Sequence, residues 1–279
     1  MANTGKCPGY EPQPEKDHKD DYNDPGKAEK AKGVINTAHI LHFTFPELPD
    51  KGGFPTVLNL IGGIMPSPEG HDVLYAHGYV PKEILLRFGE PPVHHLKVTV
   101  TASKVYSYYF GYSPFSHGIT FRSAVINGSA TLLRYSPDTP QCKAEISDKE
   151  ITSKDELPWA LFNIVEGMFG SEHRWNDTRH PFKDEELKRV PVLRVEIDKS
   201  ASRLHERLGV LGYEPDWETS SGEKYWEGSI PIWETYGDHI QGNTKRDFPE
   251  YLSKVFIDRK KHNEEVAVEE AKRKSKVQG

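Results

Sequence analysis

The sequence of 279 residues predicts a mainly β protein with a few helices, a closed or partly open barrel of six or more antiparallel strands. Three observations predict this class. Short runs of β-branched and aromatic residues recur through the middle of the chain. Glycine- and proline-containing turns separate these runs. Strand and helix patterns do not alternate as they would around a parallel sheet.

The strand candidates occupy the middle of the chain. They are Ile40–Phe45, Thr56–Gly62, Val73–His77, Leu96–Ala102, Thr120–Asn127, Ala130–Tyr135, Leu193–Ile197 and Ser229–Trp233. The pair Asn127-Gly128 between two of these runs predicts a hairpin turn, because both turn positions favour a positive φ.

Three segments carry helical patterns. Pro81–Phe88 begins with a proline, which suits the first turn of a helix, and has one apolar side. Leu157–Phe169 places apolar residues at spacings of three and four. From Phe248 onward a third helix is expected, and it becomes entirely polar after Val268, where we expect it to fray in solvent.

Two charged ends flank the β-rich part and suggest three regions. Residues 1–32 are polar and rich in proline and predict a flexible arm. Residues 33–240 hold most of the β-branched and aromatic residues and predict the barrel domain. Residues 241–279 predict a charged, helical C-terminal tail.

Composition argues against several classes of protein. A formal net charge of -6 disfavours a general nucleic-acid binder. The sequence shows neither an apolar run of membrane-spanning length nor a signal-peptide pattern. The two cysteines, Cys7 and Cys142, lack metal-ligand spacing. We therefore expect a cytoplasmic protein that contacts neither nucleic acid nor membrane and holds no metal.

One strand candidate contains an arginine that needs an anion. Arg122 and Ser123 lie in an otherwise apolar run that follows the polar residues Ser116, His117 and Gly118. An arginine in such a strand is costly unless it meets a phosphate or a carboxylate. The alternative is that Arg122 lies on the solvated face of an antiparallel strand.

A second candidate anion site lies where the strand ending at His77 meets the next helix. Gly78 allows backbone N–H groups to approach a ligand, and Lys82 lies in the first helical turn, where a bound anion would explain it. The alternative is that Lys82 is solvated. The alternating strand around Asn59 would line an apolar slot with one amide, which suits a flat heterocycle.

Trp226 lies in a predicted strand, Tyr225–Ile232, where alternation places it on the same face as Gly228 and Ile230. The glycine would leave a gap in which a ring could lie against the indole. Trp226 then either walls a pocket or fills the core, as large aromatic residues in strands usually do.

In order, these segments resemble the flavin-nucleotide-binding branch of the pyridoxamine 5'-phosphate oxidase-like split barrels, which is related to nitroimidazole-resistance reductases. The resemblance covers roughly residues 33 to 236. The matching motifs are Leu41-His42-Phe43, Gly53–Asn59, Asp72–Gly78, His117–Ser123 and Tyr225–Pro231, with Arg174-Trp175, Arg179 and Pro181 before the last of them.

The resemblance implies an FMN-binding split β-barrel that forms a homodimer with the flavin at the subunit interface. The positions it implies for the flavin or its phosphate are Asn59, His77, Gly78, Arg122, Ser123 and Trp226, the last from the partner subunit. Tyr79, Lys82 and Glu83 stand where the family has a serine and a Ser-Arg pair, so Lys82 would supply phosphate charge. The aromatic run Tyr106–Phe115 would pack at the two-fold axis.

The function that follows from the resemblance is an FMN-dependent oxidoreductase of a small molecule. His117 and His42 are the candidate proton donors, because imidazole titrates near neutral pH. The alternative is a flavin- or haem-binding split-barrel protein without turnover.

Overall fold

The computed structural model describes residues 22–46, 52–89, 95–135, 156–171, 173–179, 183–208 and 221–272. The first 21 residues of the predicted arm lie outside these ranges, as do both cysteines.

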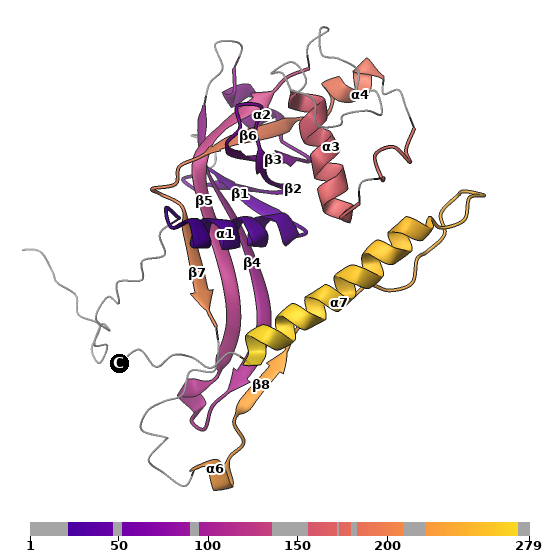
Figure 1. The fold of residues 1–279 in the computed structure, drawn as a ribbon. Coiled ribbons are helices and arrows are strands. Elements are labelled where there is room, and N and C mark those ends of the chain that lie inside the picture. Colours follow the sequence, from indigo (N-terminus) through magenta and orange to yellow (C-terminus); the bar gives the residue numbers. More distant parts are fainter. Residues whose placement is uncertain are drawn as a thin grey trace, which may run out of the picture.

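Six strands close into an antiparallel barrel, which confirms the predicted fold class (Figure 1). Around the barrel the order is β4-β1-β2-β3-β6-β5, and β5 pairs again with β4. Two further strands pair with the ends of β4 and β5 that extend beyond the barrel. The strands are β1 (Leu41–Phe45), β2 (Thr56–Pro66), β3 (Asp72–His77), β4 (Leu96–Phe110), β5 (Gly118–Leu133), β6 (Val192–Ile197), β7 (Arg203–Arg207) and β8 (Gly228–Pro231).

Helix α1 (Pro25–Thr37) packs against the inner face of the barrel sheet. Asp24 caps it by accepting a hydrogen bond from the Gly26 N–H at 2.8 Å, and Pro25 suits the first turn. Ala31 and Ile35 are fully buried in the same core as the inward residues of the strands. The predicted arm is therefore too long, because residues 25–32 belong to a packed helix.

Helix α3 (Glu156–Phe169) covers the outside of β2, β3 and β6 and forms a second core there. The ring of Tyr75 meets that of Trp159 edge to face at 5.5 Å, and the Tyr75 hydroxyl donates to the buried Glu156 carboxylate at 2.6 Å. Arg194 on β6 also pairs with Glu156 at 2.7 Å. The shorter helices are α2 (Lys82–Arg87), α4 (Asp184–Lys188), α6 (Ser221–Lys224) and the 3-10 helix η2 (Pro114–Ser116).

The predicted hairpin at Asn127-Gly128 is wrong, because both residues lie inside the continuous strand β5. A Cβ at Gly128 would lie 2.3 Å from the Glu196 carbonyl oxygen on β6. The Asn127 amide donates to Ala201 O at 2.7 Å and accepts from Thr99 at 2.6 Å. Asn127 and Gly128 therefore allow close packing between neighbouring strands and do not form a turn.

Helix α7 (Glu250–Lys272) crosses β4 and β8 on the same side of the molecule as α1 (Figure 1). The expectation that it frays after Val268 is wrong over the described residues. Glu270 and Ala271 are buried, and Ala271 O accepts a hydrogen bond from the Ser229 hydroxyl at 2.7 Å. Within the described ranges we find no helix long and apolar enough to cross a membrane.

Candidate functional site

Two of the predicted site residues form a pair on the outer face of the barrel. His42 on β1 lies opposite Asn59 on β2, and the His42 Nδ1 lies 2.9 Å from the Asn59 Oδ1. Both side chains are exposed, whereas their neighbours Leu41, Phe43 and Leu60 point into the core. Period-two alternation thus places an imidazole and an amide side by side on the surface.

His77 and Gly78 adjoin this pair at the end of β3. His77 lies opposite Ile61 on β2, two residues beyond Asn59. Burial lowers the pKa of His77, which favours the neutral form of the ring. A Cβ at Gly78 would lie 2.9 Å from a Leu60 methyl group, so the glycine lets the chain pass close to β2.

Exposed hydrophobic side chains lie beside these polar residues in the sequence. Phe54, Val57 and Tyr79 are 76%, 55% and 81% exposed. Val57 shares the outer face of β2 with Asn59, because the two positions are two residues apart. The surface combines apolar area with a few hydrogen-bonding groups, as a planar heterocycle requires.

Lys82 lies at the first turn of α2, four residues after Gly78, and lines a hollow of about 500 Å³. Among the described lining residues of this hollow are four basic side chains and no carboxylate. The basic residues are Lys82, Arg134, Lys188 and Arg189, and Leu85, Leu86 and Leu132 add apolar wall. Such a hollow attracts an anion. Lys82, the predicted phosphate residue, therefore lies in a basic hollow.

Arg122 lies on the opposite face of the sheet from His42. His42 pairs with Thr101 of β4 and Arg122 pairs with Lys104, three residues further, so the two side chains alternate to opposite faces. The predicted site residues therefore do not all form one cluster within a single chain.

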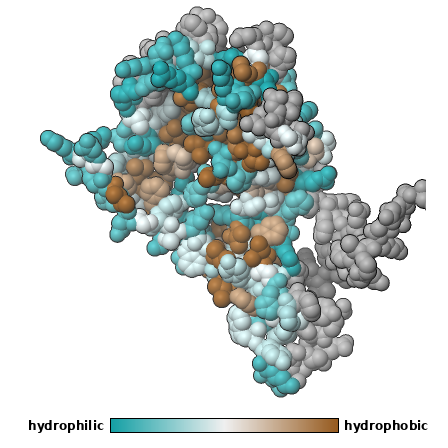
Figure 2. All heavy atoms as spheres, turned by 180° about the vertical axis from the view of Figure 1, so that it is seen from behind, coloured by the Kyte–Doolittle hydropathy of each residue, from teal (hydrophilic) through white to brown (hydrophobic). Residues whose placement is uncertain are grey.

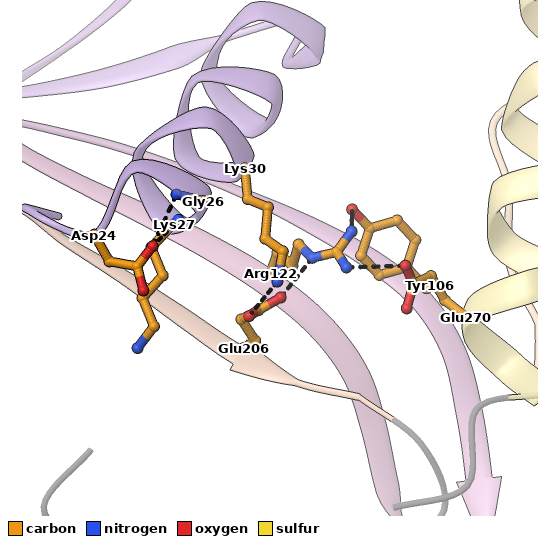
Figure 3. Close-up of polar contacts among 8 residues, drawn as sticks. All are labelled: Asp24, Gly26, Lys27, Lys30, Tyr106, Arg122, Glu206 and Glu270. Atoms are coloured by element: carbon orange, nitrogen blue, oxygen red, sulfur yellow. Dashed lines mark hydrogen bonds and ion pairs between the residues drawn. The ribbon is translucent and has the colours of Figure 1, made fainter. Parts of the chain in front are cut away.

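Carboxylates surround Arg122 (Figure 3). Its Nε donates to Glu206 at 2.8 Å and its Nη2 to Glu270 of α7 at 2.9 Å. Burial alone lowers the pKa of the Arg122 guanidinium, but its bonds to Glu206 and Tyr106 outweigh burial and raise it. The sequence predicts a phosphate or a carboxylate as the partner of Arg122, and the structure shows carboxylates. The alternative that Arg122 is solvated is wrong, because its side chain is 12% exposed. Whether Arg122 also meets a phosphate stays a prediction.

Ser123 lies next to Arg122 but faces outward, on the same side as His42. It lies opposite Ser103 of β4, whose hydroxyl donates to the Ser123 hydroxyl at 2.9 Å. Ser123 is thus separated from His42 by strand β4 and is placed at the outer surface.

His117 and Trp226 lie at the far end of β4 and β5. Both rings contact Phe110, each with centroids 5.7 Å apart. Gly118 lies opposite Tyr109, and eight residues of β4 separate Tyr109 from Thr101, the partner of His42. At roughly 3.3 Å per residue, His117 and His42 are about 26 Å apart along the strand. One chain does not bring the two candidate proton donors together.

Trp226 is 65% exposed, so the alternative that it fills the core is wrong. It precedes β8 instead of lying within it. The expected gap over Gly228 is also absent, because a Cβ there would lie 2.6 Å from the Trp226 ring. The indole itself covers the glycine.

The outer face between these two ends is apolar. Val105, Tyr108, Ile119 and Ile230 are 38%, 53%, 37% and 51% exposed. Tyr108 lies opposite both Ile119 of β5 and Ile230 of β8, which makes a row across three strands. Seen from the side opposite to α1 and α7, hydrophobic residues gather in brown areas (Figure 2). Within the predicted interface run, Tyr108 is exposed and Tyr106 and Tyr109 are buried.

Sequence reasoning missed the other basic residues beside Lys82 and the carboxylate that binds Arg122. Arg134 and Arg189 join Lys82 only through the fold, because they lie 52 and 107 residues further along the chain. Glu270 reaches Arg122 from the predicted tail. The tail is rich in charged residues, and nothing in its local sequence distinguishes the buried Glu270 from the exposed glutamates around it.

Two solved structures share this fold. The FAD and haem binding protein from Mycobacterium smegmatis matches with a TM-score of 0.58 and 15% identity over 82% of this chain and 94% of that chain. The flavocytochrome Anf3 from Azotobacter vinelandii matches with a TM-score of 0.56 and 18% identity over 81% of this chain and 88% of that chain. No protein-family model and no curated protein matches the sequence. The chain therefore has a split-barrel-like β fold.

Proposed function

We propose that the chain is a flavin-nucleotide-binding redox protein that acts on a small molecule, as a homodimer with FMN at the subunit interface. Two of the proteins that share the fold are named for flavin: one is named an FAD and haem binding protein, and the other a flavocytochrome. Flavin supplies hydride and electron chemistry when bound, and the protein supplies orientation and electrostatics.

The observation that carries the proposal is the basic hollow at Lys82, which is lined by α2, by the end of β5 and by the segment between α4 and β6. A flavin nucleotide has a flat apolar ring with a hydrogen-bonding edge, and a phosphate. Asn59 and the exposed Val57 offer a surface for the ring, and the hollow at Lys82 offers charge for the phosphate. Only the segment 78–81 separates β3 from the helix that carries Lys82.

A dimer would explain why two pairs of predicted residues, His42 with Asn59 and His117 with Trp226, lie at opposite ends of β4. The apolar row of Val105, Tyr108, Ile119 and Ile230 suits burial against a second copy. A two-fold axis through this row would bring His117 and Trp226 of one subunit toward the partner's site at β1 and β2. His42 and His117 would then supply protons to one substrate site from two subunits.

Replacing Lys82 or Arg189 with methionine is expected to weaken FMN binding about tenfold or more, because each loses a charge-assisted contact worth roughly 1.5–3 kcal/mol. Riboflavin, which lacks the phosphate, should bind the variants and the parent equally. Calorimetric titration with FMN, FAD and riboflavin measures both. Lys97→Met, an exposed change on β4 outside the hollow, is the matched control.

Unchanged FMN affinity in both variants would remove the hollow from the site. A preference for FAD would place a dinucleotide there, as in the Mycobacterium smegmatis protein's name.

The alternative is a flavin- or haem-binding protein without turnover; haem enters because one neighbour is named for haem and the other is named a flavocytochrome. An absorption spectrum separates the two cofactors, since haem gives a Soret band and flavin does not. A bound flavin that can be reduced but transfers its electrons to no acceptor would favour this alternative.

A further inference from the structure

A second cavity lies apart from the basic hollow, next to the start of β1. It has a volume of about 310 Å³, at the lower end of the range for small-molecule pockets. The end of α1, strands β2 and β4, and helices α3 and α7 form its wall. It shares no lining residue with the hollow at Lys82.

Lys104 of β4 lines this cavity without a direct hydrogen-bond or ion-pair partner among the described residues. It lies on the inner face of β4 in the same row as the buried residue Ala102. Burial lowers the pKa of Lys104, Glu234 opposes this from a distance, and the charge of Arg259 lowers it further. A partly buried ammonium without a partner is costly, and a bound anion would relieve the cost.

The other charged groups at this cavity already have partners. Arg259 donates to the Met168 and Gly167 carbonyls at 2.7 and 3.0 Å, which closes the end of α3. The Glu234 carboxylate lies 3.0 Å from His39 Nε2.

The cavity amides are engaged as well. Asn36 accepts from the Ile64 N–H at 2.6 Å and donates to the Ile64 carbonyl at 2.9 Å. Asn163 donates to Trp159 O at 2.9 Å and Asn263 to Glu234 O at 3.3 Å. Among the lysine, arginine, aspartate and glutamate side chains of the described wall, Lys104 is thus the one without a hydrogen bond or ion pair; the Tyr236 hydroxyl and the His262 ring are further polar groups of the wall.

We propose that this cavity binds a small organic monoanion whose carboxylate pairs with Lys104. The apolar body of the ligand lies against Ile61, Ile164 and Met168, which line the same space. One free ammonium matches one carboxylate, and the apolar wall favours an aryl or alkyl body over a sugar or a free inorganic ion. The proposal does not depend on flavin binding.

Calorimetric titration with 4-phenylbutyrate and with its neutral amide tests the proposal. The carboxylate should bind the parent and bind Lys104→Met at least tenfold more weakly, and the amide should bind both poorly. Lys97→Met removes an exposed ammonium from the same strand and should bind like the parent.

Gly167→Leu is a second variant that keeps the lysine but fills space. A Cβ at Gly167, which lines the cavity, meets no atom within 4 Å, so a side chain can begin there without a backbone clash. It should also abolish carboxylate binding. Equal binding of 4-phenylbutyrate to the parent and to both variants would overturn the proposal, and so would no binding to the parent.

Discussion

Replacing Arg122 with methionine is expected to destabilise the protein by about 3–5 kcal/mol, because it removes the cation that pairs with the buried Glu270 carboxylate. The Arg122 side chain is 12% exposed and that of Glu270 is 5% exposed, so solvent cannot replace the lost contact. Glu206 keeps Lys30 as a partner at 3.0 Å, so the cost arises mainly at Glu270 (Figure 3).

Urea titration of the parent and the variants measures this loss as a change in the free energy of unfolding. The double variant Arg122→Met with Glu270→Met should regain much of it, because two apolar side chains replace a buried ion pair at small cost. Arg203→Met, an exposed change at the start of β7, should have little effect. A single Arg122 variant as stable as the parent would contradict the account of how α7 is held.

Replacing Gly128 with alanine is expected to cost about 3 kcal/mol or more, because the added methyl has no room. Its Cβ would lie 2.3 Å from the Glu196 carbonyl and 2.7 Å from a Val195 methyl, so strands β5 and β6 must separate. Gly33→Ala in helix α1 is the matched control. Its Cβ meets nothing within 4 Å, so we expect a small gain from helix propensity.

The free energy of unfolding from urea titration measures both glycine variants. If Asn127-Gly128 formed a turn outside the sheet, Gly128→Ala would cost only roughly 1–2 kcal/mol, the strain of alanine at a positive φ. That outcome would contradict the continuous strand β5.

The barrel could be predicted because it follows from local pattern. In the structure, period-two alternation in β1 and β2 places His42 and Asn59 outward and Phe43 and Leu60 inward, within strands that their composition predicts. Asn127-Gly128 misled, because a glycine needed for close strand contact looks the same in sequence as one needed for a turn.

The candidate site could be predicted only in part, because the positions of its residues in space depend on how distant strands and helices pair. Arg122 and His42 lie on opposite faces because their partners on β4, Lys104 and Thr101, are an odd number of residues apart. That pairing depends on a strand register that no local motif encodes. The partner of Arg122 on α7 lies 148 residues away. The distance along β4 between His42 and His117 follows from the same register.

Titration of the purified chain with FMN, followed by flavin absorption and by the mass of the complex in light scattering, tests the central claim most directly. We predict a dimer that binds one FMN per chain. Lys82→Met should weaken FMN binding about tenfold or more and leave the affinity for riboflavin unchanged. A monomer that takes up neither FMN nor FAD at micromolar concentration would contradict the proposed function.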